Sequence, residues 1–161
     1  MGKPTAYLLT WTCYGTWLHG DERGSVDDEH NLYGWPVVEP DPDYVNVSAS
    51  RLKHPPVVLD AARRASVEAT IAAHHAFRGW FLHAAKVRTN HVHVVAGGIE
   101  IEPGSAVGQF KAWTTRRLRE AGLVGEAAEV WTKRSSTRYL WDDDSVRRAV
   151  QYVREGQGTN L

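Results

Sequence analysis

The sequence has almost no cysteine, no net charge and no long apolar run. Its 161 residues include one cysteine, Cys13, which excludes an internal disulfide and a zinc site of clustered cysteines. No apolar run approaches the roughly 18 residues of a membrane-spanning helix, and the first residues lack the apolar core of a signal peptide. A hydrophobic content of 42% suits one compact domain. We expect a single domain over residues 1–161, soluble and cytoplasmic, with no membrane partner.

Charge is distributed unevenly although its sum is zero. Residues 21–43 contain eight acidic side chains and one basic one, Arg23. Residues 103–154 contain ten basic and six acidic side chains, a net charge of +4. Because distribution matters more than the sum for nucleic-acid binding, the later half offers a candidate basic surface.

The segment 89–95, Thr-Asn-His-Val-His-Val-Val, alternates polar and apolar residues and predicts a β-strand. Side chains alternate across a strand, so His91 and His93 should point to one side and Val92 and Val94 to the other. Two imidazoles about 7 Å apart on a strand can form half of a metal site. Alternatively, they are two partly exposed strand histidines without a ligand.

Other segments show the periodicity of a helix or of a strand. Pro103 and Gly122 are suited to the start and the end of a helix. A long irregular insertion is expected at about 21–56, where Asp, Gly and Pro are frequent. A basic turn is expected at 133–136. The remaining expected elements are strands over 6–14, 80–87 and 91–96, helices over 60–77, 103–121 and 146–155, and short β-like pieces near 130–131 and 137–141.

The last predicted helix carries a tyrosine beside its apolar stripe. Asp142 to Asp144 followed by Ser145 indicate a helix start, with Ser145 able to cap it. At 100° per residue, Tyr152 falls roughly 110° from the centre of the stripe. A tyrosine on this shoulder can be a packing residue, or its hydroxyl can face a site on the neighbouring sheet. The stripe consists of Val146, Ala149, Val150 and Val153.

These features together resemble the single-tyrosine HUH transposases, in particular the branch of REP-associated tyrosine transposases. The most specific feature is the order of His91-Val92-His93 on a strand and, about 60 residues later, Tyr152 on a helix. The Gly-Thr-Trp after the first strand and the Tyr139-Leu140-Trp141-Asp142 segment add to it. The resemblance implies an α+β fold with a ferredoxin-like antiparallel sheet, the histidine strand central and the helices on one face.

The resemblance also implies a reaction. Tyr152 would cleave single-stranded DNA, forming a 5′-phosphotyrosine link and a free 3′-OH, and the reverse step would join a new end. His91 and His93 would hold Mg²⁺ or Mn²⁺, which acts as a Lewis acid on the phosphate. Relatives have a third ligand, Gln or Asn, one turn after the tyrosine, where this chain has Gly156. Gln157 is our candidate for this ligand and Glu155 the alternative.

The partner implied is single-stranded DNA that carries a hairpin, bound by a monomer or a homodimer. Exposed aromatic residues such as Trp113 or Trp131 could stack on unpaired bases, although a single tryptophan is more typical of the core. The candidate phosphate contacts are Lys111, Arg116, Arg117, Lys133, Arg134 and Arg138.

Two other functions fit the same residues. The chain could be a catalytically inactive relative that binds DNA hairpins, which the glycine at position 156 favours. It could instead be a metal-dependent hydrolase or metal-binding domain unrelated to DNA, in which His91 and His93 are joined by His83 or His19.

Overall fold

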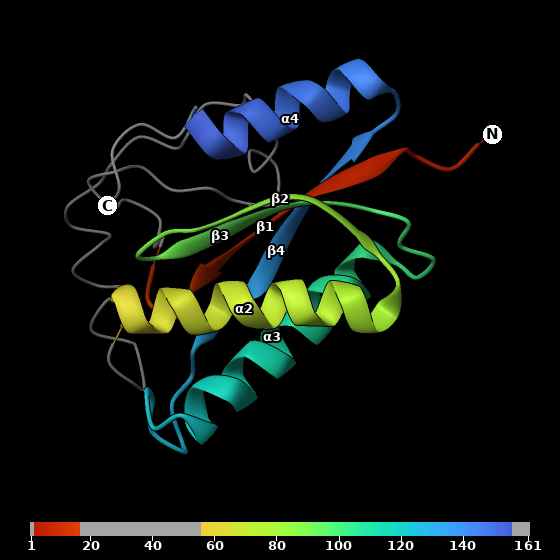
Figure 1. Cartoon of the computed structure of the whole chain (residues 1–161). Helices are drawn as coiled ribbons and strands as arrows, with labels where there is room; N and C mark the ends of the chain where they lie inside the picture. Colours follow the sequence, from red (N-terminus) through yellow and green to blue (C-terminus); the bar gives the residue numbers. More distant parts are fainter. Residues whose placement is uncertain (1, 17–55, 156–161) are drawn as a thin grey trace.

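A computed structural model of the chain describes residues 2–16 and 56–155, and these form one four-stranded antiparallel sheet with helices packed on it. The strand order is β2-β3-β1-β4, so the histidine strand β3 is interior. This βαββαβ arrangement followed by a helix confirms the ferredoxin-like α+β prediction (Figure 1). The elements are β1 (Ala6–Cys13), α2 (Ala61–Arg78), β2 (Phe81–Val87), β3 (His91–Gly97), α3 (Pro103–Glu120), β4 (Trp131–Leu140) and α4 (Asp143–Glu155).

The helices cover both faces of the sheet, so the expectation of helices on one face was wrong. Helices α2 and α3 pack on one face and α4 on the other (Figure 1). The apolar stripe of α4, formed by Val146, Ala149 and Val153, is buried against Val95 of β3 and Leu140 of β4. A sheet that presents apolar residues on both faces needs a cover on each, and α4 supplies the second one.

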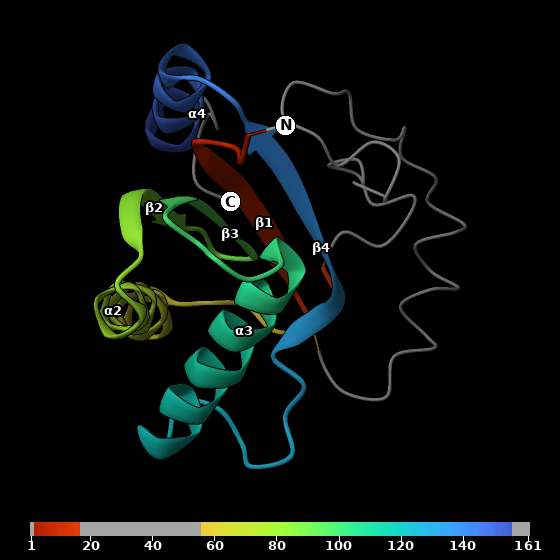
Figure 2. The ribbon, with the colours of Figure 1, turned by 90° about the vertical axis from the view of Figure 1, so that its right-hand side faces the viewer.

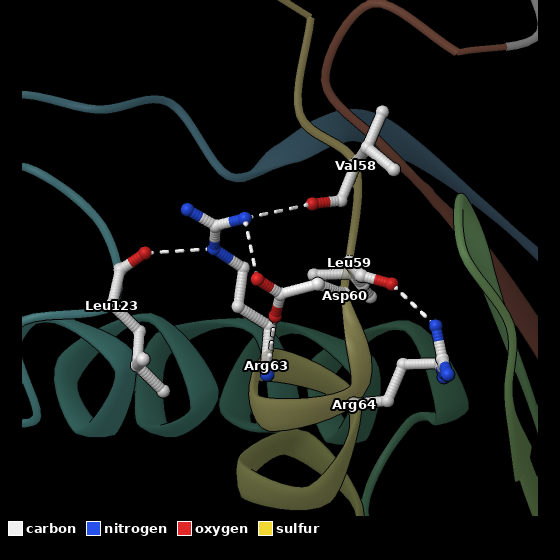
Figure 3. Close-up of polar contacts among 6 residues, drawn as sticks. All are labelled: Val58, Leu59, Asp60, Arg63, Arg64 and Leu123. Carbon is white, nitrogen blue, oxygen red and sulfur yellow. Dashed lines mark hydrogen bonds and ion pairs between the residues drawn. The ribbon is translucent and has the colours of Figure 1, made fainter.

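Helix α2 begins and ends where its cap residues predict. The carboxylate of Asp60 accepts the backbone N–H of Arg63 at 2.9 Å, and Gly79 follows the helix with a left-handed φ of 73°. Arg63 also donates from Nε to the carbonyl of Leu123 at 2.7 Å, which ties α2 to the segment after α3 (Figure 3). The start of α2 is therefore fixed relative to the rest of the domain.

Strand β4 is one continuous strand, whereas the sequence suggested two short pieces joined by a turn at 133–136. Ser135 and Ser136 pair with Trp11 and Thr10 of β1 instead of turning. The register shifts only between Trp11 and Cys13. Because β4 is an edge strand with polar residues along its middle, its sequence lacks the apolar alternation that identifies a strand (Figure 2).

Helix α4 starts at Asp143, three residues before the predicted start, because Asp142 and Ser145 cap it reciprocally. The Asp142 carboxylate accepts the N–H of Ser145 at 2.8 Å, while the Ser145 hydroxyl donates to the Asp142 carbonyl at 2.9 Å. The cap is thus Asp142 and not Ser145. The hydrogen bond from the Ser145 N–H holds the pKa of Asp142 below its usual value.

Two further predictions concern whole segments. The insertion expected at 21–56 lies outside the described residues except for Pro56, and Met1 and residues 156–161 lie outside them as well. The helices present in the described part are all too short or too polar to cross a membrane. Cys13 is a buried core residue, and burial raises its pKa to about 12.

Truncating the stripe of α4 should weaken the docking of this helix. Val153 is 0% exposed, so Val153→Ala removes two methyl groups from a packed site and should cost about 2 kcal/mol. Urea denaturation measures this cost, and the exposed Gln151→Ala on the same helix should change stability by less than about 0.5 kcal/mol. Equal effects of the two variants would contradict the packing described here.

Candidate active site

His91 and His93 lie side by side on the face of the sheet that α4 covers. Their ring centroids are 4.8 Å apart, and each residue is only 6% exposed. Val92 and Val94 point into the opposite core with α2 and α3, as strand alternation requires. The two imidazoles are therefore a buried pair held by an interior strand.

Both rings are oriented through Nδ1. The Nδ1–H of His91 donates to Oδ1 of the buried Asn90 at 2.7 Å, and Nδ1 of His93 lies 2.8 Å from the hydroxyl of Thr10. Thr10 is the direct cross-strand neighbour of His93 on β1. These contacts orient each ring through Nδ1, and Nε2 is the nitrogen through which each imidazole would bind a metal.

Tyr152 of α4 lies against this pair. Its ring centroid is 5.7 Å from that of His93, with the rings at 81°, and the residue is half-buried. His93 thus contacts His91 on one side and Tyr152 on the other. The sequence places these residues about 60 positions apart, and the docking of α4 brings them together within one chain.

Two basic residues near the pair were not predicted from the sequence. Lys86 of β2 is the cross-strand neighbour of His93, so it shares the face of the imidazoles. Arg88 follows β2 and is 5% exposed. Burial lowers the pKa of Arg88, and an electrostatic interaction with Tyr152 opposes this shift. The available signal was positional, since Lys86 and Arg88 immediately precede Asn90 and His91 in a hairpin.

A third protein ligand for a metal is not found among the described residues. In residues 2–16 and 56–155, no three His, Cys, Asp or Glu side chains are grouped so that they could hold an ion. Glu155, the alternative ligand, is exposed and completes no such group. Gln157, our candidate, lies outside the described residues.

The other histidine ligands considered do not join the pair within the described part. The ring centroids of His83 and Phe81 are 4.6 Å apart with the rings at 51°, and His83 lies beside Gly97, at the end of β3 away from His91. The metal site with His83 that the sequence allowed is therefore wrong, because pairing separates it along the sheet from His91. His19 lies outside the described residues.

Lys111 of α3 does not project into solvent. Its amine donates to the carbonyls of Thr132 at 2.8 Å and Arg134 at 2.9 Å, which fastens α3 to β4. Burial lowers the pKa of Lys111 to about 8. The sequence predicted Lys111 as a phosphate contact and did not reveal that its side chain reaches back to β4.

The other predicted phosphate contacts are divided between two regions. Arg116 and Arg117 are exposed on α3, across the sheet from Tyr152. Lys133 and Arg134 are exposed on β4. Arg138 is half-buried and pairs with Leu8, whose side chain belongs to the core under α4, so Arg138 shares the face of the histidines.

Of the two candidate stacking residues, Trp131 is a core residue and the suggestion of base stacking was wrong for it. Trp131 is 6% exposed, and its indole N–H donates to the hydroxyl of Thr114 at 2.9 Å. Trp113 is 37% exposed, and the guanidinium of Arg116 lies 5.3 Å from its ring centroid.

Comparison with known proteins supports the fold. No protein-family model matches the sequence, and no curated protein matches it either. Among solved structures, a REP-associated tyrosine transposase bound to a REP hairpin matches with a TM-score of 0.51 and 11% identity. The chain shares the fold of this transposase. The match covers 94% of this chain but only 66% of the transposase chain, just under two thirds.

Replacing Lys111 should change how stability depends on pH. The pKa of this amine is about 8 in the folded chain against 10.5 for an ordinary lysine, so the unfolded chain binds more protons between these values. The contribution of Lys111 to the free energy of unfolding therefore rises as pH increases from about 8 towards 10. Urea denaturation should show that, over this range, the free energy of unfolding of wild type rises relative to that of Lys111→Met. The exposed Lys133→Met controls for loss of charge, and parallel curves for wild type and Lys111→Met would contradict the assignment.

Proposed function

We propose that this chain is a metal-dependent single-stranded DNA transposase or endonuclease with Tyr152 as its nucleophile. The observation that carries the proposal is the contact of Tyr152 with His93, beside His91, within one chain. A tyrosine against paired imidazoles on an interior strand places a nucleophile beside two possible metal ligands, which suits metal-assisted phosphoryl transfer. The hairpin-bound transposase with the same fold supports DNA as the substrate class.

The donor atoms suit a divalent ion with mixed ligands. Two imidazoles oriented by Thr10 and Asn90 present Nε2, and nitrogen ligands favour Mn²⁺ more than Mg²⁺. Gln157 is proposed as a further, oxygen ligand, and oxygens of water and of the phosphate would complete the shell. The bound ion would polarise the scissile phosphate and stabilise its developing negative charge.

The residues of the chain account for the rest of the reaction. A tyrosine hydroxyl is a weak nucleophile at neutral pH, so its position must compensate. Packing of α4 holds Tyr152 at the edge of the site, with its ring against His93. Its oxygen attacks phosphorus as its proton passes to water, the bond to the 3′-oxygen breaks, and that oxygen takes a proton from water and leaves as a 3′-OH. Attack by another 3′-OH on the phosphotyrosine reverses these steps, so strands are rejoined without ATP.

The surroundings of the site suggest how DNA approaches it. Lys86 and Arg138 lie on the same face as the imidazoles and are proposed to bind backbone phosphates near the cleaved bond. Lys133 and Arg134 extend this surface along β4, whereas Arg116 and Arg117 would contact a more distant part of a hairpin. Because the pair and the tyrosine meet in one chain, the proposed reaction needs no partner subunit. We propose that the protein acts in the cytoplasm.

The test is whether Tyr152 becomes covalently linked to DNA. Purified protein is incubated with Mn²⁺ and single-stranded hairpin oligonucleotides from the DNA flanking its gene, then run on a denaturing gel. A 3′ label should move to the mass of the protein, while a 5′ label should stay on a shortened strand, because the link is to the 5′ phosphate. The adduct should be absent in Tyr152→Phe and strongly reduced in His91→Ala.

Tyr139→Phe is the matched control, since Tyr139 is an exposed tyrosine of β4 that packs on Tyr7 and Trp141. This variant should form the adduct as wild type does. Tight hairpin binding without any adduct would reject the nuclease and favour the inactive DNA-binding relative. An adduct that persists in Tyr152→Phe would assign the nucleophile elsewhere.

A further inference from the structure

We propose that Arg88 binds a non-bridging oxygen of the phosphate that Tyr152 attacks. This inference rests on the proposed function and adds to it a substrate-binding residue. Arg88 is absent from the sequence pattern of two histidines and a tyrosine. It enters the site only through the folded hairpin of β2 and β3.

The backbone around Arg88 is held firmly next to the histidines. Its N–H donates to the carbonyl of His91 at 2.8 Å. The next two carbonyls, of Thr89 and Asn90, accept the N–H groups of Leu59 at 2.6 Å and Cys13 at 2.8 Å. The turn that carries Arg88 is therefore tied to β3, to β1 and to the segment before α2.

The segment before α2 is itself anchored. Arg64 donates to the carbonyl of Leu59 at 2.8 Å, while Arg63 bonds to the carbonyls of Val58 and Leu123 (Figure 3). These bonds fix the position of Leu59, whose backbone N–H donates to the carbonyl of Thr89 in the hairpin turn. A side chain that starts from such a turn is restricted in where it can reach, which a precise phosphate contact requires.

The guanidinium of Arg88 is buried and electrostatically coupled to Tyr152. The residue is 5% exposed, and an electrostatic interaction with Tyr152 opposes the effect of burial on its pKa. Arginine stays protonated in proteins. At low solvent exposure a charge acts strongly on its neighbours, because water screens it little. Arg88 also lies opposite His91 in the hairpin, next to the pair Val87 and Val92, so strand alternation places its side chain on the face of the imidazoles and Tyr152.

The chemistry of arginine matches the phosphate that must reach this position. The planar guanidinium donates two parallel hydrogen bonds to two oxygens of a phosphate, which lysine cannot do. For Tyr152 to attack, the phosphorus must lie within contact distance of its hydroxyl, and hence near Arg88. Arg88 would hold the diester in line and stabilise the charge that develops on its oxygens. Loss of one such donor typically slows a reaction about 10²- to 10³-fold.

The test combines a protein variant with a neutral substrate. In the Tyr152→Phe background, which cannot cleave, hairpin affinity is measured with a normal linkage and with a methylphosphonate at the cleaved position. Loss of the anionic oxygen should weaken binding about tenfold or more while Arg88 is present. Both proteins are measured in EDTA, so that no metal ion contacts the phosphate, and in Tyr152→Phe with Arg88→Gln the two oligonucleotides should then bind nearly equally. If the methylphosphonate weakens both proteins to the same degree, Arg88 does not contact that phosphate.

Three controls separate this contact from folding and from net charge. Urea denaturation checks that Arg88→Gln is folded. If Arg88→Gln does not fold, Arg88→Lys is used in its place, because it keeps the charge but lacks the two parallel N–H donors of the guanidinium. Arg147→Gln removes a positive charge from the surface of α4, where Arg147 pairs with Asp144, and should preserve the methylphosphonate effect. In proteins that cleave, Arg88→Gln should slow adduct formation about 10²-fold or more, whereas Arg147→Gln should not.

Adduct formation tests the nuclease activity, whereas the methylphosphonate response tests the contact of Arg88 with phosphate. If wild type forms no adduct, the nuclease proposal fails, and the methylphosphonate is then moved along the bound strand one linkage at a time. A position where only proteins with Arg88 respond supports the phosphate contact. A response independent of Arg88 at every position overturns it.

Discussion

The packing of α4 on the free face of the sheet is the interaction on which the candidate site depends. Val146, Ala149 and Val153 form a narrow apolar stripe, buried against side chains of β1, β3 and β4. Tyr152, next to the last of these residues, is thereby held at the edge of the interface with its ring against His93. Removal of this helix would leave the histidine pair without its tyrosine and uncover that face of the sheet.

Strand pairing supplies the second constraint. Because β3 is interior, His93 has a fixed neighbour on each side, Thr10 on β1 and Lys86 on β2. One neighbour orients the imidazole, and the other places a positive charge on the same face. The hairpin turn adds Asn90 and Arg88, which orient His91 and bring a buried guanidinium beside Tyr152. Residues from three strands and one helix thus meet at the hairpin of β2 and β3, whose turn is hydrogen-bonded to β1 and to the segment before α2.

Local periodicity predicted much of this arrangement. Strand alternation placed His91 and His93 on one side, and helical spacing placed Tyr152 on the shoulder of its helix. The same rules could not say which face of the sheet α4 would cover, since an amphipathic stripe is complementary to either apolar face. They also failed for β4, an edge strand whose polar middle resembles a turn. Lys111 and Arg88 were misjudged or missed because their roles depend on contacts with other elements, which periodicity does not encode.

We propose that His91, His93 and Tyr152 surround one metal-binding position. Metal binding there can be tested without knowing the DNA target. Mn²⁺ is titrated into the protein while the ring resonances of its histidines and tyrosines are followed by NMR, since the paramagnetic ion broadens signals of nearby protons. We expect the ring resonances of His91, His93 and Tyr152 to broaden selectively, and those of Tyr139 to stay sharp. His91→Ala should abolish the broadening. Broadening centred on other residues, or none at millimolar Mn²⁺, would contradict this metal-binding position.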